Sequence, residues 1–137
     1  MFAGLNDFIG VWQLSREISH DDASDASFRG QARLIPKQDG LLYHETGQLQ
    51  IEGQSAVNAE RRYFWRPAEQ GAIDVFFDDG RAFHRIDPTR PEDTHFCDPD
   101  TYTVHYRFSD WPEWQANWRV SGPKKSYRLT SLYKKLL

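Results

Sequence analysis

The sequence predicts an all-β fold: a single up-and-down antiparallel β-barrel of about ten strands with a short N-terminal helix. Three observations predict it. Apolar and polar residues alternate with a period of two through most of the chain, and helical periodicity is scarce. Turn residues separate the alternating runs at regular intervals, as at Asp79-Gly80. Nine Phe, six Tyr and five Trp among 137 residues supply ample surface to build a barrel wall.

The elements follow in chain order. A helix is expected at residues 2–8, as a lead-in to the first strand, and a short turn around 110–113. The alternating runs predict strands at 11–19, 28–35, 41–51, 59–66, 72–77, 81–86, 94–97, 101–108, 114–120 and 126–133. Tight turns between consecutive strands favour a meander, and closure into a barrel removes exposed sheet edges. The length corresponds to one domain, residues 1–137.

Composition narrows the function classes. Seventeen Lys and Arg against twenty Asp and Glu give a net charge of -3, which does not favour a nucleic-acid partner. No window approaches the roughly 20 apolar residues of a membrane span, and the chain start lacks the basic region of a signal peptide. Cys97 is the only cysteine, which fits a reducing compartment. We therefore expect a cytoplasmic protein without membrane partners, either a monomer or a homodimer.

The alternate residues that would face the barrel interior are not purely apolar. They include Arg16, Glu45, Arg61 or Arg62, His84, His95 and Tyr127. Because burying unpaired charge is costly, such a set indicates a polar-lined cavity. A register shifted by one residue would instead send each of them to solvent. Two arginines against Glu45 would leave positive charge for an anionic ligand, unless the charges only neutralise one another.

Two segments and a set of aromatic residues are candidates for the site. In 79–84, the planar guanidinium of Arg81 can bind a carboxylate through two hydrogen bonds, and the imidazole of His84 is of a type that titrates near neutral pH. In 95–102, His95 and Cys97 share a strand face, but a zinc site needs more ligands, so no metal is expected. Aromatic residues that could line a pocket or fill the core are Trp12, Tyr63, Trp65, Phe83, Tyr102, Tyr106, Trp114 and Trp118.

Gly10-Val11-Trp12 at the first strand, with Arg128 in the last, resembles the calycins, which include lipocalins and fatty-acid-binding proteins. The resemblance implies that Trp12 packs across the barrel floor near the C-terminal basic residue. The longer pattern is similar to a bacterial lipocalin-like family of unknown function, through 43–47, 62–65, 77–84, 95–102 and 118–127. That family implies a fold and no activity. Heme-binding barrels of this shape carry their His late, whereas no His follows His105, so no cofactor is expected.

Two functions follow from these residues. The first is a binding module for a small, partly apolar, anionic ligand. Its polar contacts would be Arg16, Glu45, Arg62, His84, His95 and Tyr127, and its walls Trp65, Phe83, Tyr102 and Trp118. The alternative is a lyase, isomerase or decarboxylase that uses Glu45 or His95 as general acid–base beside an Arg anchor. A barrel filled by side chains would have neither function.

Overall fold

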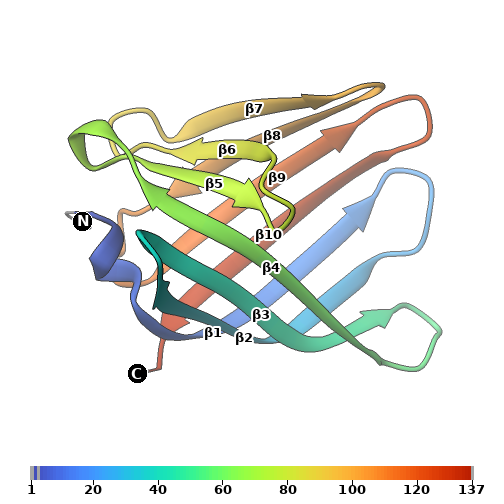
Figure 1. Cartoon of the computed structure of the whole chain (residues 1–137). Coiled ribbons are helices and arrows are strands. Elements are labelled where there is room, and N and C mark those ends of the chain that lie inside the picture. The colour runs from blue at the N-terminus through green and yellow to red at the C-terminus, as the bar shows by residue number, and fades with distance from the viewer. Residues whose placement is uncertain (1, 3, 137) are drawn as a thin grey trace.

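The computed structural model describes residues 2 and 4–136 and forms a meander of ten antiparallel strands (Figure 1). The strands are β1 (Gly10–His20), β2 (Ala26–Lys37), β3 (Gly40–Ile51), β4 (Val57–Pro67), β5 (Ile73–Phe77), β6 (Ala82–Ile86), β7 (Glu92–Cys97), β8 (Asp100–Arg107), β9 (Trp114–Ser121) and β10 (Ser126–Lys135). Each predicted run overlaps one of them, with ends that agree to within two residues, which confirms the predicted all-β up-and-down fold.

The sheet curls into a nearly closed barrel. Its order is β6-β5-β4-β3-β2-β1-β10-β9-β8-β7, so the first and last strands of the chain pair with each other. The two ends of this order are β6 and β7. Within the described residues no backbone ladder joins them, and the barrel has one seam there.

The predicted N-terminal helix is wrong in extent. Only Leu5–Phe8 are helical, as a single 3-10 turn called η1, and residue 3 of the predicted segment lies outside the described residues. The turn begins only at Leu5 because Gly4 is extended, with φ -180 and ψ -171. At its end, the Phe8 carbonyl accepts a hydrogen bond of 2.9 Å from Trp12 Nε1. The chain turns there to place the Phe8 ring under the barrel. A second 3-10 turn, η2 (Glu69–Gly71), was not predicted.

Aromatic rings close the end of the barrel where β1 begins. Phe8 and Trp12 are fully buried, and Phe8 meets Trp114 edge to face at 5.3 Å between ring centroids. The ammonium of Lys135 lies 4.5 Å from the Trp12 ring centroid and donates to the Ile9 carbonyl at 2.7 Å. The basic residue beside Trp12 is therefore Lys135 rather than Arg128. The register pairs Trp12 with Lys135, whereas Arg128 pairs with Ser19 and is exposed.

The opposite end carries most of the tight turns, and we call it the mouth. The turns after β1, β3, β7 and β9 lie there, away from η1 and from both termini (Figure 1). The β5–β6 turn uses Gly80 at a φ of 92°, which favours glycine, and the Gly80 amide donates to the Phe77 carbonyl at 2.9 Å. Of the described part of the chain, no helix has the length and apolarity needed to cross a membrane.

Candidate functional site

The barrel encloses a cavity of about 520 Å³. Every residue predicted for the site lines it except Arg62: these are Arg16, Glu45, Trp65, Phe83, His84, His95, Tyr102, Trp118 and Tyr127. Exposed residues such as Arg81, Phe96 and Cys97 also line it, so the cavity reaches solvent at the mouth. The volume is within the range of small-molecule sites.

Arg62 does not face the cavity, and the assignment of this residue to the interior was wrong. Glu45 lies opposite Arg61 in the β3–β4 register, and His44 lies opposite Arg62. Because successive side chains on a strand alternate between faces, Arg61 points inward with Glu45 while Arg62 points outward. Arg62 instead lies 3.6 Å from Glu60 Oε2 on the outer surface.

Phe83 and His84 are consecutive on β6, yet both line the cavity. A β-bulge explains this arrangement. Val75 pairs with His84 and Phe76 pairs with Ala82, which leaves Phe83 as the inserted residue. The extra residue breaks the alternation of faces and brings two adjacent side chains to the same side.

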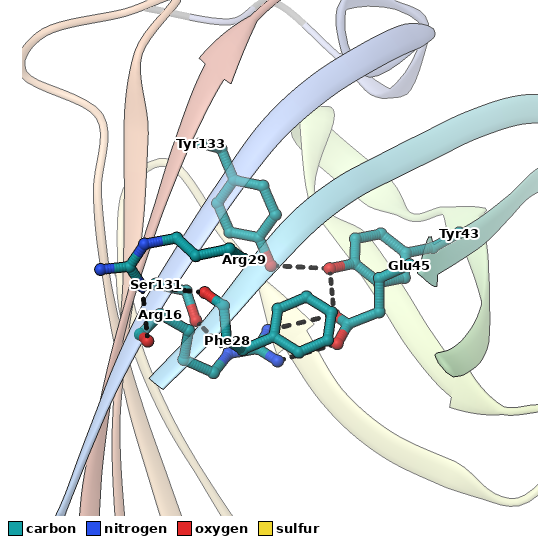
Figure 2. A network of polar contacts seen from close by, with 7 residues as sticks. All are labelled: Arg16, Phe28, Arg29, Tyr43, Glu45, Ser131 and Tyr133. Carbon is teal, nitrogen blue, oxygen red and sulfur yellow. Dashed lines mark hydrogen bonds and ion pairs between the residues drawn. The ribbon is translucent and has the colours of Figure 1, made fainter. Parts of the chain in front are cut away.

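The inner part of the cavity wall carries a hydrogen-bonded polar network (Figure 2). Arg16 donates to both carboxylate oxygens of Glu45, at 2.8 and 3.0 Å, and through Nε to Ser131 Oγ at 2.7 Å. Tyr43 donates to Glu45 Oε1 at 2.6 Å and shares a hydrogen bond of 2.7 Å with Tyr133. The strands β1, β3 and β10 thus place complementary groups together, and the network is satisfied without a ligand.

The environment sets the ionisation of this network. Burial opposes the charge on Arg16, but hydrogen bonds and attraction to Glu45 outweigh it and raise the pKa of Arg16. Burial likewise opposes the charge on Glu45, while hydrogen bonds from Arg16 and Tyr43 hold the pKa of Glu45 below its ordinary value. Burial raises the pKa of Tyr133 to about 12. The network is therefore an ion pair flanked by neutral phenols near neutral pH.

His84 forms a second internal polar contact. Its Nε2 lies 2.8 Å from the Tyr106 hydroxyl, and its Nδ1 is buried without a hydrogen-bond partner in the described part of the chain. Burial, with a smaller effect from the charge of His95, lowers the pKa of His84 to about 3. His84 is consequently neutral at physiological pH and is a weak base.

Four other polar side chains on the cavity wall have no hydrogen-bond partner among the described residues. Arg61, Tyr63, His95 and Tyr127 form no side-chain hydrogen bond or ion pair with any described residue. Tyr102 differs from them, because its hydroxyl accepts from Lys125 at 3.2 Å. The groups left open to a ligand are therefore distinct from the satisfied network around Glu45.

Aromatic rings surround the middle of the cavity. Phe83 stacks on Phe77 at 4.4 Å and on Trp118 at 5.1 Å between ring centroids. His84 and His95 meet the same ring edge to face, at 4.5 and 5.3 Å. Of the other predicted walls, Tyr102 and Trp118 contact the Phe83 ring, whereas Trp65 stacks on Tyr43.

Three lining residues, Tyr43, Phe77 and Tyr133, were not singled out as site residues from the sequence, and Arg61 was named only as the alternative to Arg62. A signal was present for most of them. Tyr43 shares the inward alternation of β3 with Glu45, and Tyr133 lies on the alternating face of β10. In the described residues no group of three or more His, Cys, Asp or Glu could hold a metal ion.

The comparisons with known proteins give a family but no activity. No curated protein matches the chain. A similar solved structure is a de novo designed fluorescence-activating β-barrel, at 10% sequence identity and a TM-score of 0.48, covering 99% of this chain and 100% of that one. A family described as a family of unknown function (DUF6314) matches residues 8–135. Because that match runs from the barrel floor through the last strand, the chain belongs to DUF6314.

Proposed function

We propose that the chain is a binding module that holds a small, partly apolar, anionic molecule in the barrel cavity. One observation carries this proposal. The charged side chains on the described cavity wall are Arg16, Glu45, Arg61 and Arg81. Arg16 and Glu45 neutralise each other, and Arg81 binds Asp79 at 2.7 Å. Arg61 is the cation on this wall that forms no hydrogen bond or ion pair with a described residue.

The position of Arg61 suits an anionic group. The residue is exposed and also lines the cavity, so it lies where the cavity meets solvent. Its charge acts on Glu45 of β3 and on Tyr127 of β10, which are on different parts of the barrel wall. A guanidinium in this place can bind a carboxylate, sulfonate or phosphate with two parallel hydrogen bonds. The open hydroxyls of Tyr63 and Tyr127 are further donors.

The apolar part of the ligand would lie deeper. Trp65, Phe77, Phe83 and Trp118 line the same cavity and are buried or half-buried, whereas Arg61 is exposed. Their large flat surfaces favour an apolar body over a strongly hydrated one. The ligand would therefore lie with its charge at the mouth and its body among the rings.

The barrel floor supports a relationship to the calycins. Trp12 of Gly10-Val11-Trp12 is fully buried there, and the cation over its ring comes from the last strand, at Lys135. The calycin resemblance implies this kind of Trp–cation contact. Many calycin barrels carry ligands, which agrees with a binding role for this chain.

The same geometry favours binding over the alternative of acid–base catalysis. Glu45 has both carboxylate oxygens occupied and a lowered pKa, so it is a poor proton donor. His95, the other predicted acid–base residue, forms no hydrogen bond with a described residue that would orient its ring. A general acid or base works best when its pKa lies near the working pH.

The test uses a matched pair of arginine variants. Anilinonaphthalene sulfonate, a fluorescent apolar anion, is titrated into wild type, Arg61→Ala and Arg62→Ala. We expect Arg61→Ala to weaken binding about tenfold or more, the value of one lost charge-assisted contact. Arg62→Ala should bind like wild type, because Arg62 lies on the outer face.

A neutral probe completes the design. Phenylnaphthylamine has a similar ring system without the sulfonate, so its affinity should be the same in all three proteins. The proposal fails if wild type binds neither probe. Equal weakening of sulfonate binding by both substitutions would show only a general effect of surface charge and would remove Arg61 from the site.

A further inference from the structure

The Phe83 ring lies in a slot built for a flat ring. Phe77 and Trp118 both stack on this ring, with interplanar angles of 21° and 14°. No ring contact joins Phe77 to Trp118 among the described residues, which indicates that Phe83 lies between them. His84 and His95 contact it edge to face at 89° and 85°. Offset stacking on both faces with edges around the rim is the arrangement in which aromatic rings attract each other most.

The backbone under this ring is irregular. Phe83 is the inserted residue of the β6 bulge, and β6 is a five-residue strand at the end of the sheet order. No backbone ladder joins it to β7 among the described residues. The Phe83 side chain is half-buried, in contrast to the fully buried Ile86 on the same strand. Its ring is thus held mainly by ring contacts at an edge of the sheet.

We propose that Phe83 is a placeholder, and that the slot between Phe77 and Trp118 receives the planar aromatic ring of the ligand after Phe83 turns out. The inference rests on the proposed function and narrows its ligand class to a flat aromatic ring bearing an anionic group. Aromatic cages also attract cations. The positive charge of Arg61 on the same cavity wall, which no carboxylate of a described residue pairs with, disfavours a cationic guest.

The alternative is that Phe83 is a permanent wall of the cavity. The two alternatives predict opposite changes in ligand affinity when the Phe83 ring is removed. If Phe83 is a wall, its removal deletes a contact and weakens binding. If Phe83 is a placeholder, its stacking on Phe77 and Trp118 must be broken before the ligand ring can stack there. Removing the Phe83 ring then removes this free-energy cost of binding. Because each stacked pair contributes a modest free energy, we expect about tenfold tighter binding in the second case.

The experiment compares Phe83→Ala, Phe83→Leu and Trp118→Ala with wild type. Phe76→Ala is the matched control, since Phe76 is the neighbour of Phe77 on β5 and does not line the cavity. The probes are anilinonaphthalene sulfonate and dodecanoate, an anion without a ring. Affinity is measured by titration and the association rate by stopped flow, and each variant's melting transition confirms that it is folded.

The placeholder predicts a specific pattern. Phe83→Ala should bind the aromatic sulfonate about tenfold tighter and faster than wild type, with a smaller gain for dodecanoate. Phe83→Leu should also bind the aromatic sulfonate more tightly than wild type. If Phe83→Ala does not fold, Phe83→Leu distinguishes a placeholder from a wall. Trp118→Ala should lose affinity, and Phe76→Ala should be unchanged.

Three results overturn the inference, and they differ from a failure of the proposed function. Equal or weaker sulfonate binding by the folded Phe83 variants makes Phe83 a wall. An equal gain for dodecanoate shows that added space, and not a slot for a ring, explains the effect. Unchanged affinity in Trp118→Ala removes the slot. If no protein in the series binds either probe, the binding function itself is refuted.

Discussion

At the scale of single residues, the Arg16–Glu45 pair shows why a buried charge here does not identify the ligand contact. Its two charges are almost inaccessible, and Ser131 and Tyr43 form further hydrogen bonds with them. The attraction within a buried ion pair offsets its desolvation penalty only when the geometry is good and the remaining donors and acceptors form hydrogen bonds. We infer that it shapes the inner wall, while Arg61 carries the free charge.

His84 gives a prediction about acid stability. Its pKa of about 3 lies below the ordinary value of 6.5, so between these values the unfolded chain binds a proton that the folded chain does not. Acid therefore favours the unfolded state. Below about pH 6, His84 should lower the free energy of unfolding by up to about 1.4 kcal/mol per pH unit. His84→Gln should lose this part of the slope, measured by urea unfolding across the range.

Comparing how the free energy of unfolding changes with pH in wild type and His84→Gln isolates the contribution of His84. Acidic groups such as Glu45 contribute equally to both proteins. The exposed His105 provides the control, and His105→Gln should keep the wild-type slope. Parallel curves for wild type and His84→Gln would mean that the folded protein accepts the proton on His84 as readily as the unfolded chain does.

At the scale of elements, the alternation of apolar residues was sufficient to predict the strands but not every face. On β4 the run Arg61-Arg62 offers a cation in either register, and composition alone gives no preference. The choice is made by the pairing of Glu45 with Arg61, a contact between strands. Local sequence does not encode such a partner, so Arg62 was chosen wrongly.

The bulge on β6 likewise depends on a contact between strands. Period-two alternation assigns Phe83 and His84 to opposite faces, yet both line the cavity. Alternation had assigned His84 to the interior, and Phe83 was proposed as an aromatic wall. No local pattern in 81–86 marks the inserted residue, because the bulge arises from pairing with β5. The contact of Lys135 with Trp12 depends in the same way on the β1–β10 register.

The β2–β3 pair gives a prediction about packing. Gly30 and Gly47 face each other across the two strands. A Cβ on Gly30 would lie 2.0 Å from the Thr46 carbonyl oxygen, and a Cβ on Gly47 would lie 2.3 Å from that of Arg29. Because backbone must move to admit either methyl group, Gly30→Ala or Gly47→Ala should lower the free energy of unfolding by about 1–3 kcal/mol.

Gly4 is the control for these substitutions. A Cβ there has no neighbour within 4 Å, and its φ of -180 is accessible to any residue. Urea unfolding of Gly4→Ala should match wild type to within about 0.5 kcal/mol. If Gly30→Ala is equally well tolerated, the close approach of β2 and β3 is not required for stability.

At the scale of the whole molecule, the two ends of the barrel have different roles. The floor is dense, with Phe8, Trp12 and Trp114 in mutual ring contact. The mouth end carries the open polar groups and the exposed Phe96, whose exposed fraction is 75%. Stability is therefore concentrated at one end, which leaves the other free to admit a ligand.

The seam between β6 and β7 is the weakest line around this barrel. In place of a backbone ladder, the Arg85 amide donates to Asp93 Oδ2 at 2.7 Å, and Phe83 meets His95 across the gap. Amides on β6 and β7 should exchange hydrogen faster than those of the doubly paired β1 and β2, because fewer hydrogen bonds must open.

Asp93→Ala tests whether the seam opens as a local unit. Losing the carboxylate that accepts the Arg85 amide should speed exchange there about tenfold or more, as expected for a hydrogen bond to a charged group. Exchange in β1, β2 and β10 should not change. Asp78→Ala, in the exposed β5–β6 turn, is the control. Equal acceleration in every strand would mean that Asp93 stabilises the barrel as a whole. A change confined to β6 and β7 would show that the seam opens as a local unit beside the Phe83 ring of β6.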